Sequence, residues 1–199
     1  VDTNDAYVCA NVTLTSNDDN GINEPESAVD TTDGAGNGEL AGLTNFMWWA
    51  DDGDNVLEIG ETVLSQGPIG ALPLNTPYPL ALADSDENIW TGTGGPITGA
   101  STKYVGKAWC FGTLTPAARP TGTYSSGPAG DNNGNSVAGE PEDGGFHCDG
   151  STLDNRSQTD SLTADVSFSS VQSRNNASFQ CPEPMQACTP GNVNVFANG

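Results

Sequence analysis

The densest group of possible metal ligands in this sequence lies in one short stretch that directly follows two adjacent tryptophans. Calcium binds six to eight oxygen ligands, and closely spaced carboxylates can supply them where glycines such as Gly53 and Gly60 let the backbone turn sharply. An EF-hand loop is excluded, because its third ligand position falls on Val56 and its invariant glycine position on Leu57. The alternative is a solvated acidic hairpin whose Asp and Asn residues only make the turn. The sequence predicts a calcium site built from Asp51, Asp52, Asp54, Asn55, Glu58 and Glu61.

Catalytic chemistry is not expected from the residues present. The chain has one histidine, His147, and no HExxH motif, so the two-histidine zinc site of a metalloprotease cannot form. Carboxylate pairs such as Asp51 with Glu61 could serve a hydrolase, but 26 acidic residues make chance pairs common. The sequence therefore favours a protein that is not an enzyme.

Five cysteines lack the close CxxC pairs of a zinc or redox site, so disulfides in an oxidising compartment account for them best. A bridge from Cys110 to Cys148 would close a Gly- and Pro-rich excursion of the chain. We expect Cys9 to pair with Cys181, because this bridge would join the first long strand to the end of the last one. Spacing does not fix the connectivity, and Cys188 is left over for an intermolecular bond or a partner beyond this chain.

Three sequons agree with a secreted, extracellular location and predict glycosylation at Asn11, Asn155 and Asn176. The chain opens at Val1 without an initiator methionine or a signal-peptide pattern, which favours a processed mature form or a partial chain.

The charge balance limits the classes of partner. With 5 basic and 26 acidic residues the net charge is −21, and nucleic acid and anionic membranes are therefore not expected as partners. The same charge keeps copies of the chain apart at low salt, so close assembly would need salt screening or bound cations. Adaptation to high salt is an alternative interpretation of the same charge. No run of about 18 apolar residues is present, so no membrane span is expected.

Apolar and polar residues alternate in several short segments, which is typical of half-buried strands. The segments are Ala6–Leu14, Leu43–Trp49, Val63–Leu64, Tyr78–Ala83, Thr102–Phe111, Ser161–Ser170 and Asn192–Ala197. Two long loops interrupt them: an acidic loop at 16–42 and a Gly- and Pro-rich loop at 112–145. We expect one all-β domain over residues 1–199, a jelly-roll-like β-sandwich.

The alternation also predicts which side chains form the core. Ser161–Ser170 is expected to be a core strand that points Leu162, Ala164, Val166 and Phe168 inward. In Thr102–Phe111, one face carries Val105, Trp109 and Phe111, and the other carries Tyr104, Ala108 and Cys110.

Several long blocks of the sequence occur together and in order: YVCANVTL, NGINEPE, FMWWADDGDNVLEIGE, PLALADSDENIW, YVGKAWCFGTLT, HCDGSTLDNRSQTDSLTADVSF and VQSRNNASFQC. On these blocks, which span Tyr7 to Cys181, the chain resembles the TasA/camelysin family of secreted proteins from bacteria and archaea. The resemblance implies a jelly-roll subunit that polymerises into extracellular filaments of a biofilm matrix or cell surface. Its partner would be a further copy of itself, with other matrix or surface components as additional candidates.

In that family a donor strand from one subunit completes the sheet of its neighbour, which supplies main-chain hydrogen bonds and alternate apolar side chains. The family's donor is N-terminal, which places it here on Val1, Asp2, Thr3, Asn4, Asp5, Ala6 and Tyr7. This segment is short and polar, so Asn192–Ala197, with Val193 and Val195 on one side, is a second candidate. The alternative function is a monomeric, calcium-dependent glycan-binding module that stacks sugars on Trp48, Trp49 or Trp90.

Overall fold

The computed structural model describes residues 3–125 and 129–183 of the chain. The strands are β1 (Ala6–Asp19), β2 (Gly34–Ala35), β3 (Thr44–Asp51), β4 (Val63–Pro68), β5 (Tyr78–Ala83), β6 (Tyr104–Phe111), β7 (Thr113–Pro116), β8 (Phe146–Asp149) and β9 (Ser161–Gln172). The helical segments are single turns: α1 (Leu40–Leu43), η1 (Glu26–Ala28), η2 (Ile69–Ala71), η4 (Pro141–Gly144) and η5 (Asn155–Ser157). Cys188 and the strand candidate Asn192–Ala197 lie outside the described residues.

β1 is the central strand of a first sheet, here called the β1 sheet. β9 pairs antiparallel with one edge of β1 along almost its whole length, while β5 and the two-residue β2 pair with the other edge. The predicted alternation is confirmed from Ala10 to Leu14, where Ala10, Val12 and Leu14 are buried, but Tyr7 and Cys9 on the other face are buried as well. The acidic loop predicted from Ser16 begins later, since β1 runs on to Asp19. Pairing with β9 overrides the poor strand propensity of these polar residues.

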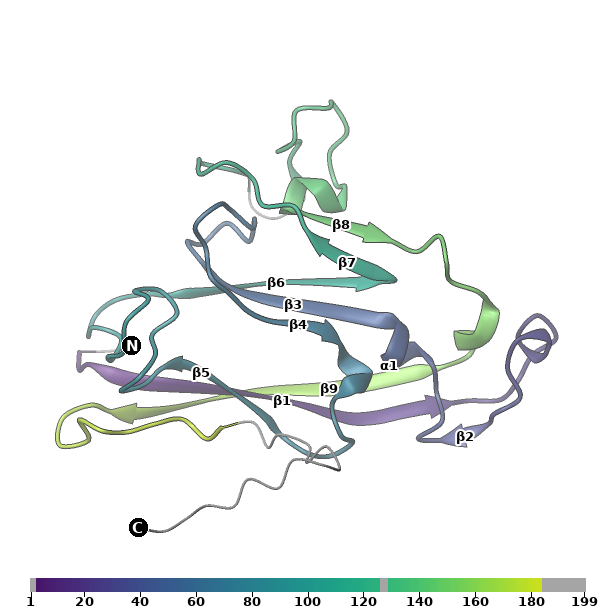
Figure 1. Cartoon of the computed structure of the whole chain (residues 1–199), viewed down its shortest axis with the longest axis horizontal. Coiled ribbons are helices and arrows are strands. Elements are labelled where there is room, and N and C mark those ends of the chain that lie inside the picture. Colours follow the sequence, from purple (N-terminus) through teal and green to yellow (C-terminus); the bar gives the residue numbers. More distant parts are fainter. Residues whose placement is uncertain (1–2, 126–128, 184–199) are drawn as a thin grey trace, which may run out of the picture.

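β3 is the central strand of a second sheet, here called the β3 sheet, in the order β4-β3-β6. Figure 1 shows this sheet packed against the β1 sheet, with the β7–β8 pair beyond it. The side chains on the two faces of β3 therefore pack into two different hydrophobic cores. Trp48 packs toward the β1 sheet beside Leu80 and Leu82, while Trp49 lies fully buried with Met47, Phe146 and other residues on the opposite side. The predicted all-β sandwich is confirmed, and the jelly-roll connectivity remains a prediction.

The indole of Trp49 fits only because β6 has a glycine beside it. A Cβ atom on Gly106 would lie 2.1 Å from Cε2 of Trp49. Register pairs the two residues directly across the β3–β6 ladder. The close approach of backbone and ring thus fixes the position of Trp49 at the start of the acidic turn.

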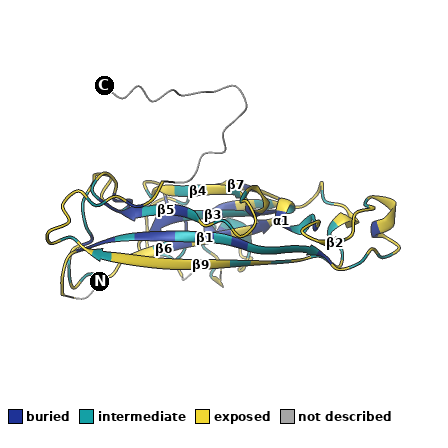
Figure 2. Cartoon of the chain, turned by 90° about the horizontal axis from the view of Figure 1, so that it is seen from below, coloured by how far each residue is buried: buried dark blue, intermediate teal, exposed yellow. Residues whose placement is uncertain are grey.

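β9 forms where it was predicted, but it is not a core strand. Figure 2 shows β9 exposed along most of its length, on the same side of the sandwich as β6 and opposite β4 and β5. Phe168, predicted to point inward, is 60% exposed, and Val166 is 44% exposed. Leu162 and Ala164 are partly buried against the small core that includes Leu14. The prediction fails for Val166 and Phe168 because alternation identifies an apolar face, not whether another layer covers it.

The predicted Gly- and Pro-rich loop at 112–145 also contains regular structure. Its first residues form β7, which pairs with β8, and its last residues form η4. Asp143 is fully buried in η4 and accepts backbone hydrogen bonds from Asn132, Asn133, Gly139 and Glu140. One buried carboxylate therefore organises the end of this loop.

Candidate functional site: the acidic turn and the open edge

The predicted acidic turn follows β3 directly, and its first carboxylate is a structural centre. Asp51 is buried, and its Oδ1 accepts a hydrogen bond of 3.1 Å from Nε1 of Trp49. Its Oδ2 accepts from the backbone N–H groups of Gly53 at 2.9 Å and Asn55 at 3.2 Å. The carboxylate thus accepts hydrogen bonds from one indole N–H and two backbone N–H groups of the turn, as the Asp side chain does in an Asx turn.

Three other carboxylates of the turn, those of Asp54, Glu58 and Glu61, also accept hydrogen bonds from backbone N–H groups. Asp54 Oδ1 accepts from the N–H of Val56, and Glu58 Oε1 accepts from the N–H of Gly122. The two oxygens of Glu61 accept from the N–H groups of Asp52 and Glu58. Asn55 Oδ1 accepts from the N–H of Lys107 and so ties the turn to β6. Most of the oxygens that the sequence offered to calcium therefore hold the backbone in place.

Crowding of these carboxylates raises their affinity for protons. Burial, together with the neighbouring charges of Asp51, Glu58 and Asp52, raises the pKa of Glu61 to about 7. Burial and nearby carboxylates also raise the pKa of Asp54 and of Glu58. Two trios in the turn bring one oxygen per residue within 4.8 Å of one another: Asp51, Asp52 and Glu61, and Asp52, Asp54 and Glu58. The structure brings the predicted residues together, and calcium binding here stays a prediction.

An open cleft of about 550 Å³ lies beside the turn. Asp51, Asp52 and Glu61 line one part of it, and Trp90 and Tyr104 line another. Nε1 of Trp90 donates a hydrogen bond of 2.8 Å to the backbone carbonyl of Tyr104, which fixes the indole to the start of β6. The cleft therefore combines aromatic faces with carboxylates.

The tryptophans do not form a set of exposed rings on which a sugar could stack. Trp49 is fully buried, while Trp48 and Trp90 are partly buried against the core between the two sheets. The most exposed tryptophan is Trp109 on β6, at 69%. Glycan stacking on Trp49 is therefore excluded, because packing beside Gly106 leaves no free ring face.

Both predicted disulfides are present. Cys9 is bonded to Cys181, with Cα atoms 5.7 Å apart, and this bridge holds the chain beyond β9 against β1. Cys110 is bonded to Cys148, with Cα atoms 5.6 Å apart, and joins β6 to β8. Disulfides of this kind persist in an oxidising compartment.

The sequons differ in accessibility. Asn155 and Asn176 are exposed, in η5 and in the turn after β9 respectively. Asn11 is half-buried in the middle of β1, with β5 and β9 paired on its two sides. Asn155 and Asn176 therefore have room for a glycan, whereas Asn11 is enclosed by the sheet.

The N-terminal donor predicted at Val1 to Tyr7 is largely part of the fold. Ala6 and Tyr7 are buried residues of β1 that pair with Gln172 and Val171 of β9. Ala6 also exchanges two backbone hydrogen bonds with Ile97. The donor assignment is therefore wrong for these two residues, because their hydrogen bonds are already made within the chain.

Thr3, Asn4 and Asp5 complete the described part of the predicted donor. All three are exposed, but Asp5 is held by its neighbours: Oδ1 accepts from the N–H of Gly99, and its carbonyl accepts from the N–H of Ser173. Val1 and Asp2 lie outside the described residues. A free donor strand is therefore not available between Thr3 and Tyr7.

The open edge of the sandwich is the surface formed by Val166 and Phe168 of β9 with Trp109 and Phe111 of β6. Val166 lies opposite Val12 and Phe168 opposite Ala10, so both point to the core side of the β1 sheet. Register likewise puts Trp109 and Phe111 on the face of the β3 sheet that is turned toward the β1 sheet. All four side chains are exposed, because the two sheets end here without a further described strand.

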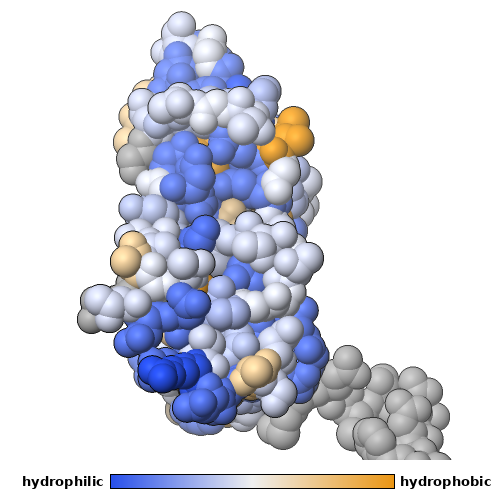
Figure 3. Space-filling view, turned by 90° about the vertical axis from the view of Figure 1, so that its left-hand side faces the viewer, coloured by the Kyte–Doolittle hydropathy of each residue, from blue (hydrophilic) through white to orange (hydrophobic). Residues whose placement is uncertain are grey.

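Apolar surface of this kind is not spread over the whole molecule. Figure 3 shows one end of the sandwich, where hydrophilic surface predominates and apolar residues are scattered. At the open edge, by contrast, the rings of Trp109 and Phe46 stack with centroids 6.2 Å apart. Asp165 of β9 pairs with Thr13 and so lies on the opposite face of the strand. The described inward-facing residues of the open edge thus include no carboxylate.

Sequence reasoning assigned Val166 and Phe168 of the open edge to the core, and placed Trp109 and Phe111 on one shared face. The face assignment within Thr102–Phe111 is confirmed, since Val105, Trp109 and Phe111 share one side, yet the opposite face, with Ala108 and Cys110, is the buried one. A signal for exposure was present in Lys107, which sits between Val105 and Trp109 on the apolar face. One charged residue among aromatics indicates a face that is only partly covered.

Comparison with protein-family models, with curated proteins and with solved structures finds no match to this chain. No helix among the described residues is long and apolar enough to cross a membrane.

Proposed function

We propose that the chain is a subunit of an extracellular protein filament, in which a strand of one copy adds to β9 of the next. The observation that carries this proposal is the open edge: a 12-residue edge strand whose inward face exposes Val166 and Phe168 opposite Trp109 and Phe111. Strand addition needs unpaired main-chain groups for hydrogen bonds and an apolar face for alternate side chains. β9 offers both.

β9 also lacks the features that normally prevent edge-to-edge pairing. Protected edges are short, or carry lysine, proline or a bulge that blocks a further strand. The sequence of β9, SLTADVSFSSVQ, contains neither lysine nor proline, and its one charged residue is Asp165. Among the described residues β9 pairs only with β1. A long edge without protection supports a role as an acceptor.

The occupant we propose is the C-terminal segment of a second copy, residues 184–199. The segment includes Asn192–Ala197, where Val193 and Val195 can face the open edge together. An extended chain of this length spans roughly 50 Å, more than the roughly 40 Å of a 12-residue strand. The bridge from Cys181 to Cys9 anchors the start of the segment to β1.

The charge of the chain sets the conditions for assembly. A net charge of −21 makes copies of the chain repel one another at low salt. The open edge itself has no inward-facing carboxylate, and Lys107 lies beside it on the same face of β6. Filaments should therefore form when salt or divalent cations screen the remaining surface.

Electron microscopy of the disulfide-bonded full chain at several salt and calcium concentrations tests this function. Val166→Asp places a charge on the open edge and should abolish filaments. Val137→Asp is the matched control, because Val137 is similarly exposed, at 50%, in the loop before η4. A third variant that ends at Glu183 should remain monomeric if the C-terminal segment is the donor.

The outcomes separate the parts of the proposal. Filaments from the shortened chain would remove the C-terminal donor and leave strand addition to another segment. Filaments from Val166→Asp would remove the open edge as the acceptor. Monomers of the unmodified chain under every condition would overturn the filament function as a whole.

The cleft beside the acidic turn supports a second candidate function, a calcium-dependent glycan-binding module. Trp90 and Tyr104 offer ring faces for a sugar, and Asp51, Asp52 and Glu61 offer hydrogen-bond acceptors. Saturable binding of an oligosaccharide by calorimetry, lost in Tyr104→Ala and kept in Val166→Asp, would favour this function. Binding unaffected by Tyr104→Ala would exclude the cleft.

A further inference from the structure

A second group of carboxylates lies at the other end of the sandwich, and its residues are far apart in the sequence. Asp19 ends β1, Glu26 begins η1, and Asp30 follows η1. Glu39 precedes α1, and Asp160 precedes β9. Here they are called the loop cluster.

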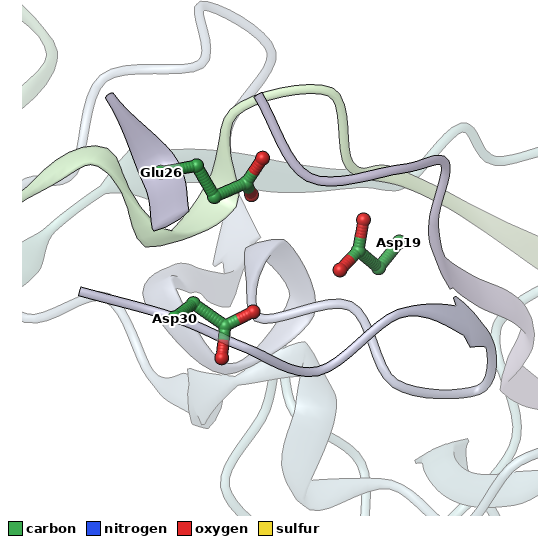
Figure 4. Close-up of side chains that lie close together, drawn as sticks. All are labelled: Asp19, Glu26 and Asp30. Carbon is green, nitrogen blue, oxygen red and sulfur yellow. The ribbon is translucent and has the colours of Figure 1, made fainter. Parts of the chain in front are cut away.

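The loop cluster brings ligand atoms close together in two overlapping trios. Asp19, Glu26 and Asp30 each offer one oxygen within 4.8 Å of the others, and so do Asp19, Glu39 and Asp160. Figure 4 shows the carboxylates of Asp19, Glu26 and Asp30 directed toward a common space. Asp19 belongs to both trios and therefore lies at the centre of the cluster.

Four oxygens of the cluster are buried without a hydrogen-bond partner among the described residues. They are Asp19 Oδ2, Glu26 Oε1, Glu39 Oε2 and Asp160 Oδ1. Glu26 is fully buried and Asp19 is 3% exposed, so water can reach neither carboxylate freely. A buried, unpaired carboxylate is strongly unfavourable unless a cation or a proton compensates its charge.

The other oxygen of each of these residues is held in place by the surrounding chain. Asp19 Oδ1 accepts from the N–H of Gly21, and Glu26 Oε2 accepts from the N–H of Asn23. Asp160 Oδ2 accepts from the N–H groups of Glu39 and Leu40. One oxygen of Asp19, Glu26 and Asp160 is thus oriented by backbone N–H groups, which leaves the second oxygen directed into the cluster.

Local donors do not neutralise the cluster. Thr32 donates through Oγ1 to Asp30 and to Glu39 Oε1, but a hydroxyl carries no positive charge. Arg156 is close enough to interact electrostatically with Asp30 and Glu39, yet its guanidinium is engaged by Asp154 through two hydrogen bonds of 2.8 and 2.7 Å.

We propose that Asp19, Glu26, Asp30, Glu39 and Asp160 bind a divalent cation of the calcium class. Carboxylate oxygens are the ligands that hard cations take, and calcium accepts six to eight of them in flexible geometry, mono- or bidentate. Magnesium fits less well, because it keeps several waters and requires a near-octahedral shell that a closed set of carboxylates does not provide. Bound calcium would join the end of β1, the long loop 20–39 and the start of β9.

Calorimetric titration of calcium chloride into the chelator-treated full chain tests this site. Glu26→Gln removes one charge with little change of shape and should weaken binding at least tenfold. Glu24→Gln is the matched control, the same substitution at an exposed glutamate of the same loop that belongs to neither trio, and should leave the affinity within about twofold. Magnesium chloride in place of calcium should bind more weakly.

Thermal unfolding of the same proteins separates loss of the site from loss of the fold. In chelator, Glu26→Gln should melt at a higher temperature than the unmodified chain, because it removes an uncompensated buried charge. In calcium the order should reverse. A variant that melts lower in both solutions, an unmodified chain that gives no binding heat at millimolar calcium, or binding lost in Glu24→Gln and kept in Glu26→Gln would each overturn the proposal. None of these readouts depends on filament formation.

Discussion

The acidic turn at 51–61 and the loop cluster are both groups of carboxylates, yet they differ in what their oxygens contact. In the turn, Asp51, Asp54 and Glu61 accept hydrogen bonds from amides two to four residues away. In the loop cluster, Asp19 and Glu26 each keep a buried oxygen without a donor among the described residues. Carboxylates that are close together in sequence accept hydrogen bonds from the backbone of their own turn. Carboxylates that tertiary structure brings together have too few donors nearby, so some of their oxygens have no hydrogen-bond partner among the described residues.

The largest expected loss of stability comes from replacing Asp51, the carboxylate at the centre of the acidic turn. Asp51→Ala would leave the indole of Trp49 and the amides of Gly53 and Asn55 without their acceptor in or near the core. Three lost acceptor contacts should lower the free energy of unfolding by about 3 to 5 kcal/mol. Denaturant unfolding should show the same loss in calcium and in chelator. A loss confined to calcium solutions would show that Asp51 is mainly a metal ligand.

Calcium itself should act through the loop cluster. At a free concentration 100 times the dissociation constant, binding stabilises the folded chain by about 2.7 kcal/mol. For a chain of this size, that corresponds to a rise in melting temperature of roughly 5 to 10 °C by scanning calorimetry. Asp19→Asn should remove this rise, because Asp19 belongs to both trios. Asp33→Asn, the control at an exposed aspartate of the same loop that belongs to no trio, should retain it.

The pH dependence should distinguish the two regions by sign. Glu61 has its pKa raised from 4.5 to about 7 in the folded chain, so it contributes stability that is complete below about pH 4.5 and lost as the pH rises through 7. Melting curves in chelator should therefore show less decline from pH 5 to 8 in Glu61→Gln than in the unmodified chain. The calcium-dependent increment should instead grow as the pH rises, because protons compete with calcium for carboxylates. An unchanged decline in Glu61→Gln would contradict the role of Glu61.

The smallest effect concerns an exposed neighbour of Glu61. The charge of Asp52 contributes to the raised pKa of Glu61, so Asp52→Asn should lower the Glu61 titration midpoint from about 7. Carbon NMR of the Glu61 carboxyl group measures this midpoint. The free energy of unfolding should change by less than about 0.5 kcal/mol, because Asp52 is exposed. An unmoved midpoint would show that the charge of Asp52 does not contribute to the raised pKa of Glu61.

The local sequence pattern was sufficient to predict those elements whose structure depends on residues near one another in the chain. Alternation in Ala6–Leu14 predicted β1, since a one-residue shift of register would turn its apolar face to solvent, and the short apolar run Tyr78–Ala83 predicted β5. The five cysteines and their positions relative to the strands suggested both bridges. The acidic turn was located correctly, because Asp, Asn and Gly determine a turn through their own backbone contacts.

What the sequence by itself determined is thus the all-β class, most of the strands and the position of the acidic turn, because these depend on residues near one another in the chain. Tertiary structure alone decided that Val166 and Phe168 are exposed, since burial depends on whether another layer lies opposite. It also decided which carboxylates are left with unpartnered oxygens: Asp19 and Asp160 belong to the ends of two strands that only sheet pairing brings together. Local hydrogen bonds can be read from spacing, but the absence of a nearby donor depends on the whole fold.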